Sequence, residues 1–286
     1  MSQLPTYDAP LEPLPGTASF PLPPQPTEPP PVERLLTPRD EDRRVRVLGV
    51  DITDVSMPRA VEMLHQLIDL EEESPRLGYF VNAHTLNLSA RVPGYRDVLR
   101  RATIVFGDGT GVRWAARMKG VRLRANLCGT DLLPALLDTT PGRRFFMLGA
   151  DEATIQRAAA NAEMQFPNWT LLGYHHGYVK SESETARVIE LINAIRPDLL
   201  LVGMGNPIQE QWLDANRHRL NARLCMAVGG LFDFWAGTVS RAPRWIRGLG
   251  YEWVWRLMMQ PRQKAQRYLI GNPLFLARAV RDARGQ

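Results

Sequence analysis

The apolar positions of this chain follow two alternating patterns. Short runs of β-branched and aromatic residues indicate strands, and the stretches between them, about ten to sixteen residues long, carry apolar residues three and four apart, which indicates helices. Such alternation forms βαβ units, so we predict an α/β fold with a parallel sheet flanked by helices. The expected strands are residues 45–53 (one strand or a strand pair), 77–81, 103–107, 143–150, 169–175, 198–205 and 224–230. The expected helices are residues 56–72, 86–101, 112–119, 131–137, 152–166, 182–195 and 208–217.

The two ends of the chain differ from this pattern. Residues 1 to 38 contain 12 of the 23 prolines, so we predict a disordered Pro-rich tail that, with a charged linker, occupies 1–45. Residues 241–286 contain ten Arg and Lys against only Glu252 and Asp282, a charge of +8, whereas the whole chain is +5. We therefore predict a folded domain at 46–240 and a basic, aromatic-rich helical appendage at 241–286. Its charge indicates an anionic partner, either a phosphorylated ligand, a lipid surface or nucleic acid.

The first candidate for chemistry is Asp108, in the stretch TIVFGDGTGVRW. A strand ends there, and the flanking glycines, Gly109 among them, let the backbone approach a ligand closely. In parallel α/β sheets the carboxyl ends of the strands form the edge where ligands bind. Asp108 is therefore either a functional carboxylate or a turn former that caps the next helix.

A second candidate lies in the stretch VGMGNPIQEQW, where a buried strand turns through glycines into a helix. The free N–H groups of such a turn, around Gly205, suit a phosphate. A dinucleotide-binding pattern would need its third glycine where Ile208 stands, so NAD binding is disfavoured. Gln209 and Glu210 lie in the first helical turn and either contact a ligand or stabilise the helix dipole.

Asn82 ends another strand at the same edge, where it either contacts a ligand or caps the turn. Cys128 and Cys225 are too few for a disulfide framework and lie far from any His cluster, so we expect no metal site and a reducing, cytoplasmic location. Residues 40–42 match an Asp-x-Asp metal pattern, but they precede the first element and indicate a solvated charge run. No stretch approaches the roughly 20 apolar residues of a spanning helix.

The third candidate region is the appendage, where arginines alternate with tryptophans and tyrosines. Arginine grips phosphate in a bidentate manner, and Trp and Tyr favour a lipid–water interface. The alternative is a basic helical pair whose aromatic residues pack on the domain. The candidate arginines are Arg241, Arg244, Arg256, Arg262 and Arg267.

These three stretches together resemble the WecG/TagA/CpsF family of bacterial glycosyltransferases, glycosyltransferase family 26. The matching text is VNAHTLN, ATIVFGDGTGVRWAAR, GTDLL, FFMLGA, LLLVGMGNPIQEQW and VGGLFDFWAGTVSRAPRW, followed by GYEWVWRLMMQPRQKAQRYL. It covers about residues 47 to 270 in the order and spacing of the family.

The resemblance implies a Rossmann-like catalytic domain with an appendage that helps to close the site. The implied reaction is inverting transfer of a sugar, of the hexosyltransferase type, from a nucleotide diphosphate sugar to a polyprenyl-diphosphate-linked sugar in surface polysaccharide biosynthesis. It implies no cofactor and no obligatory metal. Asp108 falls on the general base of the family, Asn82 and Gln209 fall on its pocket residues, and the five arginines named above fall on its appendage motifs.

The resemblance also implies a cytoplasmic enzyme at the inner face of the plasma membrane, held to anionic lipid through 241–286. Removing the charge of Arg278, Arg281 or Arg284, which lie beyond the shared motifs, is expected to affect only binding to lipid vesicles. The chain departs from the family at Phe80, where Thr is common, and at Asn126, where Arg is common.

The alternative function is a Rossmann-like binding protein that binds nucleic acid with its basic C-terminus. Interleaved Trp and Arg residues suit nucleic acid as well as a lipid-linked diphosphate. The sequence favours the enzyme, without nucleic acid as a partner, because a nucleic-acid binder would not need the Asp108 and Gln209 edge. The sugar, the base and the oligomeric state stay open, with a homo-oligomer as one option.

Overall fold

The computed structural model describes residues 36, 39, 42–70, 74–243, 245–246, 251–259, 261 and 265–285, and only the backbone of Arg256. The Pro-rich tail and most of the charged linker lie outside the described residues. The predicted boundary at residue 46 falls inside the first strand, which begins at Arg43. Leu36 is buried against the core, and Asp42 accepts hydrogen bonds from Arg59, so part of the linker is tied to the domain.

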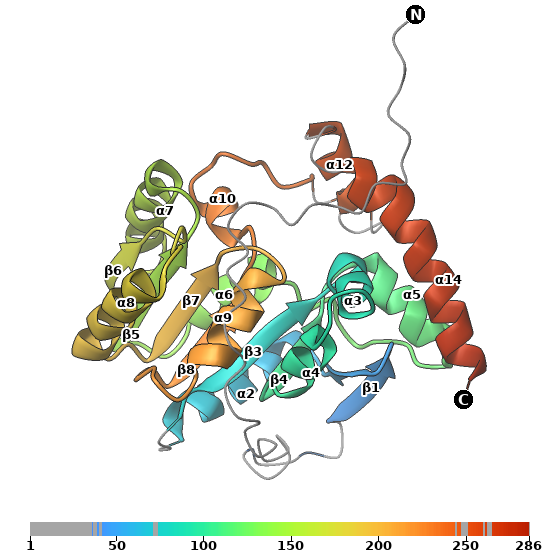
Figure 1. The fold of residues 1–286 in the computed structure, drawn as a ribbon, viewed down its shortest axis with the longest axis horizontal. Helices are drawn as coiled ribbons and strands as arrows, with labels where there is room; N and C mark the ends of the chain where they lie inside the picture. Colours follow the sequence, from blue (N-terminus) through green and yellow to red (C-terminus); the bar gives the residue numbers. More distant parts are fainter. Residues whose placement is uncertain are drawn as a thin grey trace, which may run out of the picture.

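Within the described residues, eight strands form a single sheet in the order β1-β2-β4-β3-β8-β7-β5-β6 (Figure 1). The strands β1 and β2 are an antiparallel pair joined by a two-residue turn, and the other pairings are parallel. The predicted parallel α/β fold is confirmed. The strands are β1 Arg43–Val47, β2 Val50–Asp54, β3 Arg76–Val81, β4 Ile104–Gly107, β5 Arg143–Gly149, β6 Trp169–His175, β7 Leu199–Gly203 and β8 Leu224–Ala227.

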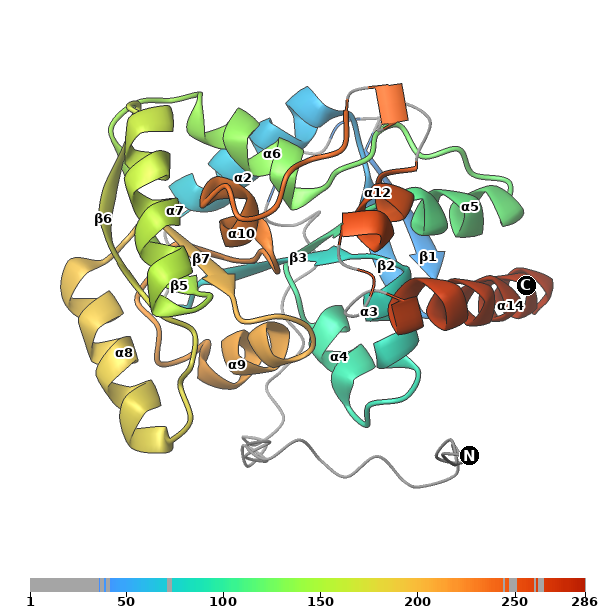
Figure 2. The same cartoon turned by 90° about the horizontal axis from the view of Figure 1, so that it is seen from above.

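Helices cover both faces of the sheet, so the central strands β3, β7 and β8 are buried on both sides (Figure 2). One apolar cluster packs α2, α6, α7 and α10 on one face, and a second cluster packs α4, α5, α8, α9 and α14 on the other. The helices are α2 Met57–Asp69, α3 Ala83–Ser89, α4 Tyr95–Arg100, α5 Thr110–Met118, α6 Gly129–Leu137, α7 Glu152–Gln165, α8 Glu182–Ile195, α9 Ile208–Asn216, α10 Leu231–Trp235, α12 Glu252–Met259, the π-helix η1 Gln266–Ile270 and α14 Gly271–Arg284.

The single helix predicted over 86–101 is wrong. The structure has two helices, α3 and α4, and the chain breaks between them at Pro93 and Gly94. Proline cannot donate the backbone hydrogen bond that a continuous helix needs, and Gly94 takes a left-handed φ of 72°. The first helix also starts earlier than predicted, because Asn82 caps it.

The helix α14, at the C-terminal end of the predicted appendage, packs on α3 and α5 rather than standing apart. Phe275 is buried at this contact, with 1% of its surface exposed. Asp282 pairs with Lys119 on α5 at 2.8 Å and accepts a hydrogen bond from the backbone N–H of Leu48 at 2.8 Å. Arg278 donates to the side-chain oxygen of Asn87 at 2.7 Å. Arg278 therefore joins α14 to α3.

Candidate active site

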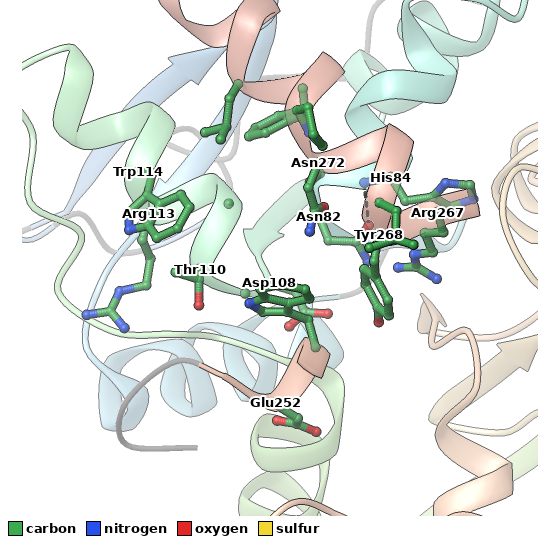
Figure 3. A pocket seen from close by; sticks show the side chains of 18 of the residues that line it. Asn82, His84, Asp108, Thr110, Arg113, Trp114, Glu252, Arg267, Tyr268 and Asn272 are labelled. Carbon is green, nitrogen blue, oxygen red and sulfur yellow. Dashed lines mark hydrogen bonds between the residues drawn. The ribbon is translucent and has the colours of Figure 1, made fainter. Parts of the chain in front are cut away.

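A cavity of about 440 Å³ lies at the carboxyl ends of β3 and β4 (Figure 3). Residues 82–84, 108–111, 113 and 114 line it from the domain, and α12, η1 and the start of α14 line it from the appendage. In Figure 3, Asp108 lies in the middle of the lining, with Arg113 on one side and Arg267 on the other. The structure thus brings two of the three candidate stretches to one cavity.

Asp108 directly follows β4 and is held there by its backbone. Its N–H donates to the carbonyl of Val81, at the end of β3, at 2.8 Å. The N-cap of α5 is Gly109, and no side chain caps that helix. Asp108 is therefore not the cap of α5, which was one of its two interpretations. Its half-buried side chain instead forms part of the cavity wall beside Gly109.

Asn82 combines the two roles that its position suggested. Its side-chain oxygen accepts from the backbone N–H groups of His84 at 3.0 Å and Thr85 at 3.1 Å, which caps α3. The same residue lines the cavity. With the oxygen engaged in the cap, the amide nitrogen is the group that Asn82 offers to a ligand.

The turn that carries Gly205, Gln209 and Glu210 is closed on itself and does not line this cavity. The side-chain oxygen of Gln209 accepts from the N–H groups of Gly205 at 3.1 Å and Gly229 at 3.0 Å. Gln209 and Glu210 are 1% and 0% exposed. The N–H group of Gly205, which was expected to suit a phosphate, therefore donates to Gln209 instead. Gln209 and Glu210 shape the turn from inside and do not contact the cavity.

Glu210 is a buried carboxyl group inside a set of hydrogen-bond donors. It accepts from the Tyr95 hydroxyl at 3.0 Å, from Asn206 at 2.5 Å and from Gln209 at 2.7 Å. Burial raises the pKa of Glu210 to about 7, although these donors act in the opposite direction. The carboxyl group therefore changes its charge near neutral pH while it supports the residue that closes the turn.

The candidate arginines divide into separate groups. Arg241 forms a two-pronged ion pair with Asp131 at the start of α6 and lies 3.8 Å from Glu252, so it ties the appendage to the domain. Arg267 lines the cavity, and its guanidinium lies 5.6 Å from the centre of the Tyr268 ring. Arg244, Arg262 and the side chain of Arg256 lie outside the described residues.

The model of the glycosyl transferase WecG/TagA/CpsF family matches residues 45–286. The chain belongs to this family. It is therefore a glycosyltransferase of the hexosyltransferase type, as the resemblance implied. Family membership favours this function over the nucleic-acid binder.

Among its relatives is the N-acetylglucosaminyldiphosphoundecaprenol N-acetyl-beta-D-mannosaminyltransferase of Staphylococcus aureus. The proteins of strains MW2 and NCTC 8325 / PS 47 are each 27% identical to this chain over 248 residues, which cover 86% of this chain and 96% of the relative. The family match at residues 45–286 spans both the predicted domain and the predicted appendage.

Several residues that line the cavity of this glycosyltransferase were not among the sequence-based candidates. They are Arg113, Trp114, Glu252, Trp253, Tyr268 and Asn272. Arg113 follows the Asp-Gly pair by four residues, one helical turn into α5, so its sequence position carried a usable signal. The sequence positions of the appendage residues carried no such signal, because the cavity forms between the appendage and the domain.

The cavity combines a carboxylate with positive charge. Asp108 supplies a carboxylate, Arg113 and Arg267 supply positive charge, and the amino end of α5 points its dipole at the same space. Across the described residues, no group of three or more His, Cys, Asp or Glu side chains is arranged to hold a metal ion. None of the described helices is both long and apolar enough to cross a membrane.

Proposed function

We propose that this protein transfers a sugar, with inversion, from a nucleotide diphosphate sugar to a polyprenyl-diphosphate-linked sugar during synthesis of a surface polysaccharide. The observation that carries the proposal is the carboxylate of Asp108, at the end of β4, in a cavity walled by Arg113 on one side and the appendage on the other. The relatives named above act on N-acetylglucosaminyldiphosphoundecaprenol, which makes that compound the first acceptor to test.

In this reaction, Asp108 accepts the proton of the acceptor hydroxyl as its oxygen bonds to the anomeric carbon of the donor. The bond from that carbon to the diphosphate breaks, and the nucleoside diphosphate leaves with the electron pair. Arg113, Arg267 and the amino end of α5 stabilise the negative charge that develops on the leaving group. Attack from the face opposite to the leaving group inverts the anomeric centre.

The surface of the appendage supports docking on the inner face of the plasma membrane. Met258, Met259 and Ile270 are 71%, 56% and 58% exposed on α12 and η1, two helices that also line the cavity. Large apolar side chains among basic residues suit an anionic lipid surface. Such docking holds the cavity beside the diphosphate of a lipid-linked acceptor.

The test is a transfer assay with a panel of nucleotide sugars and N-acetylglucosaminyldiphosphoundecaprenol, in which the product is identified by mass and its anomeric configuration by NMR. We expect one donor to give a lengthened lipid-linked product and a free nucleoside diphosphate. Absence of product with every donor on this and other lipid-diphosphate sugars, from protein that is folded, would overturn the proposal.

Membrane docking is tested separately by sedimentation with vesicles of anionic or neutral lipid. Exchanging Met258 and Met259 for serine should weaken sedimentation, and raised salt should weaken it further because the charges are screened. Met164→Ser is the matched control, because Met164 is 75% exposed on α7, away from the appendage. Equal loss in the control, or equal binding to both lipids, contradicts docking through a basic apolar surface.

A further inference from the structure

Two hydrogen bonds hold the backbone of the turn at Asp108, one from its own N–H and one from the N–H of Gly109. The N–H of Asp108 donates to the Val81 carbonyl at 2.8 Å, and the next N–H, of Gly109, donates to the side-chain oxygen of Asn126 at 2.7 Å. The first bond joins two backbone groups, which any side chains would permit. The second depends on the side chain of Asn126 alone.

Gly109 is the place where the turn most needs such a restraint. Its φ of 89° is open to glycine and strained for other residues, and space for a Cβ is empty around it. A glycine has no side chain to hold its own conformation, and no side chain caps the helix that starts there. The peptide between Asp108 and Gly109 therefore depends on Asn126 for its orientation.

The segment that carries Asn126 is itself well placed for this role. The N–H of Leu127 donates to the carbonyl of Gly107 at 3.2 Å, so residues 126 and 127 run beside the end of β4. Asn126 also lines the cavity, on the same wall as Asp108. An arginine or lysine at 126 has no acceptor atom and could not make the bond to Gly109, whereas asparagine is a neutral acceptor.

We propose that Asn126 is a positioning residue for sugar transfer, whose side-chain oxygen holds the Asp108–Gly109 peptide so that the carboxylate of Asp108 faces the acceptor hydroxyl. This inference rests on the proposed role of Asp108 as the general base. It assigns to Asn126 a function through the backbone of its neighbour, in addition to its place in the cavity wall.

Two variants of Asn126 separate this role from a loss of folding. Asn126→Ala removes the acceptor, and Asn126→Asp keeps an acceptor oxygen in the same place but adds a negative charge. Asn193 provides matched controls, because its side-chain oxygen accepts from the backbone N–H of Asn221 at the same distance of 2.7 Å, near the end of α8 and outside the cavity lining.

We expect Asn126→Ala to lower kcat by about 10-fold to 100-fold with little change in the KM for the donor, because a small misplacement of a reacting group slows the chemical step. Asn126→Asp should regain most of the rate at high pH. As the pH is lowered, its rate should begin to fall at a higher pH than the rate of the wild type does, because the added negative charge opposes ionisation of Asp108. The Ala and Asp variants of Asn193 should keep the wild-type rate and pH profile.

Hydrogen exchange measures the bond without any activity assay. The N–H of Gly109 should exchange faster in Asn126→Ala and at the wild-type rate in Asn126→Asp, whereas Asn193→Ala should affect Asn221 instead. Unchanged exchange at Gly109 in Asn126→Ala overturns the proposal, and so does faster exchange with unchanged kcat. If Asp108→Asn stays active, the general base is another residue and the proposed role of Asn126 fails with it, although the exchange result still tests the bond itself.

Discussion

Two turns at the same edge of the sheet begin alike and end differently. The β4–α5 turn and the β7–α9 turn each follow a buried strand, pass through glycines and enter a helix. In the β7–α9 turn, Gln209 folds inward and its oxygen accepts from the N–H groups of Gly205 and Gly229. In the β4–α5 turn, the acceptor comes from Asn126 on a neighbouring segment, and the acidic residue stays at the cavity wall.

The comparison shows that a polar residue after a strand does not by itself indicate a ligand contact. What decides its role is the source of the acceptor for the exposed N–H groups of the turn. When the first turn of the helix supplies the acceptor, as Gln209 does, the polar side chains are buried and hydrogen-bonded within the protein. When another segment supplies it, as in the β4–α5 turn, the acidic side chain forms part of the cavity wall. Variants of each turn should therefore affect different properties.

The largest effect is expected at the β4–α5 turn. Asp108→Asn keeps the shape of the side chain and removes the base, so turnover should fall about 10²-fold to 10⁴-fold. The melting temperature and the Kd of the donor should change little. Steady-state kinetics, thermal unfolding and calorimetry measure the three quantities. Wild-type turnover in this variant at saturating acceptor would show that another residue is the base.

The β7–α9 turn should respond in stability first. Gln209→Ala leaves the part-buried N–H groups of Gly205 and Gly229 without their acceptor, and an unsatisfied donor away from water costs about 1 to 3 kcal/mol. We expect the free energy of unfolding to fall by about 2 to 5 kcal/mol in urea titrations. Gln156→Ala, at an exposed position of α7, is the control. A large loss of rate without a loss of stability would instead indicate direct contact between Gln209 and the substrate.

Glu210 makes the closed turn sensitive to pH. Burial raises its pKa to about 7, above the value of 4.5 of an unperturbed glutamate, so the folded state binds the proton more tightly than the unfolded state. The resulting stabilisation is complete below about pH 4.5 and is lost as the pH rises through about 7, a change of about 3 kcal/mol. The side chain of Glu210→Gln cannot titrate, so the free energy of unfolding of this variant should not decrease in this way as the pH rises. Urea titrations of both proteins from pH 5 to 8 measure the difference, and parallel curves would contradict the raised pKa.

The smallest effect is expected at Asn82, which is both a cap and a cavity residue. Asn82→Ala should lower the free energy of unfolding by about 1 kcal/mol, whereas Asn82→Asp keeps a capping oxygen and should retain it. Both variants should bind substrate more weakly, because both lose the amide nitrogen. Ser56→Ala removes the cap of α2 outside the cavity lining and should lower stability alone. Full activity of Asn82→Asp would leave Asn82 with only its capping role.

Much of the fold could be predicted from local pattern. The period of the apolar residues located the strands and most of the helices, because a strand or helix must bury its own apolar face. The helix expected from residue 56 onward does begin there, with Ser56 as its N-cap. The break between α3 and α4 was also visible in Pro93 and Gly94, but the apolar spacing across them suggested a continuous helix.

The site was predictable only where one stretch of sequence determines it. The glycines around Asp108 indicated a close backbone approach, and Asp108 does line the cavity. The closure of Gln209 on Gly229 and the pairing of Arg278 with Asn87 join positions far apart in the chain, and no local pattern indicates them. Asn126 stood out as a departure from the family, but its bond to Gly109 depends on how two segments lie side by side.

The contact of Asp282 with the β1–β2 turn has a consequence for the order of folding. The hydrogen bond from Leu48 to Asp282 joins residues 234 positions apart, while β3 and β4 pair within about thirty residues. Closing so long a loop costs more chain entropy than pairing β3 with β4, so we expect this contact to form after those two strands have paired. During refolding, the circular dichroism of the sheet should therefore return before the fluorescence of Trp253, which lies in the wall that α14 helps to complete.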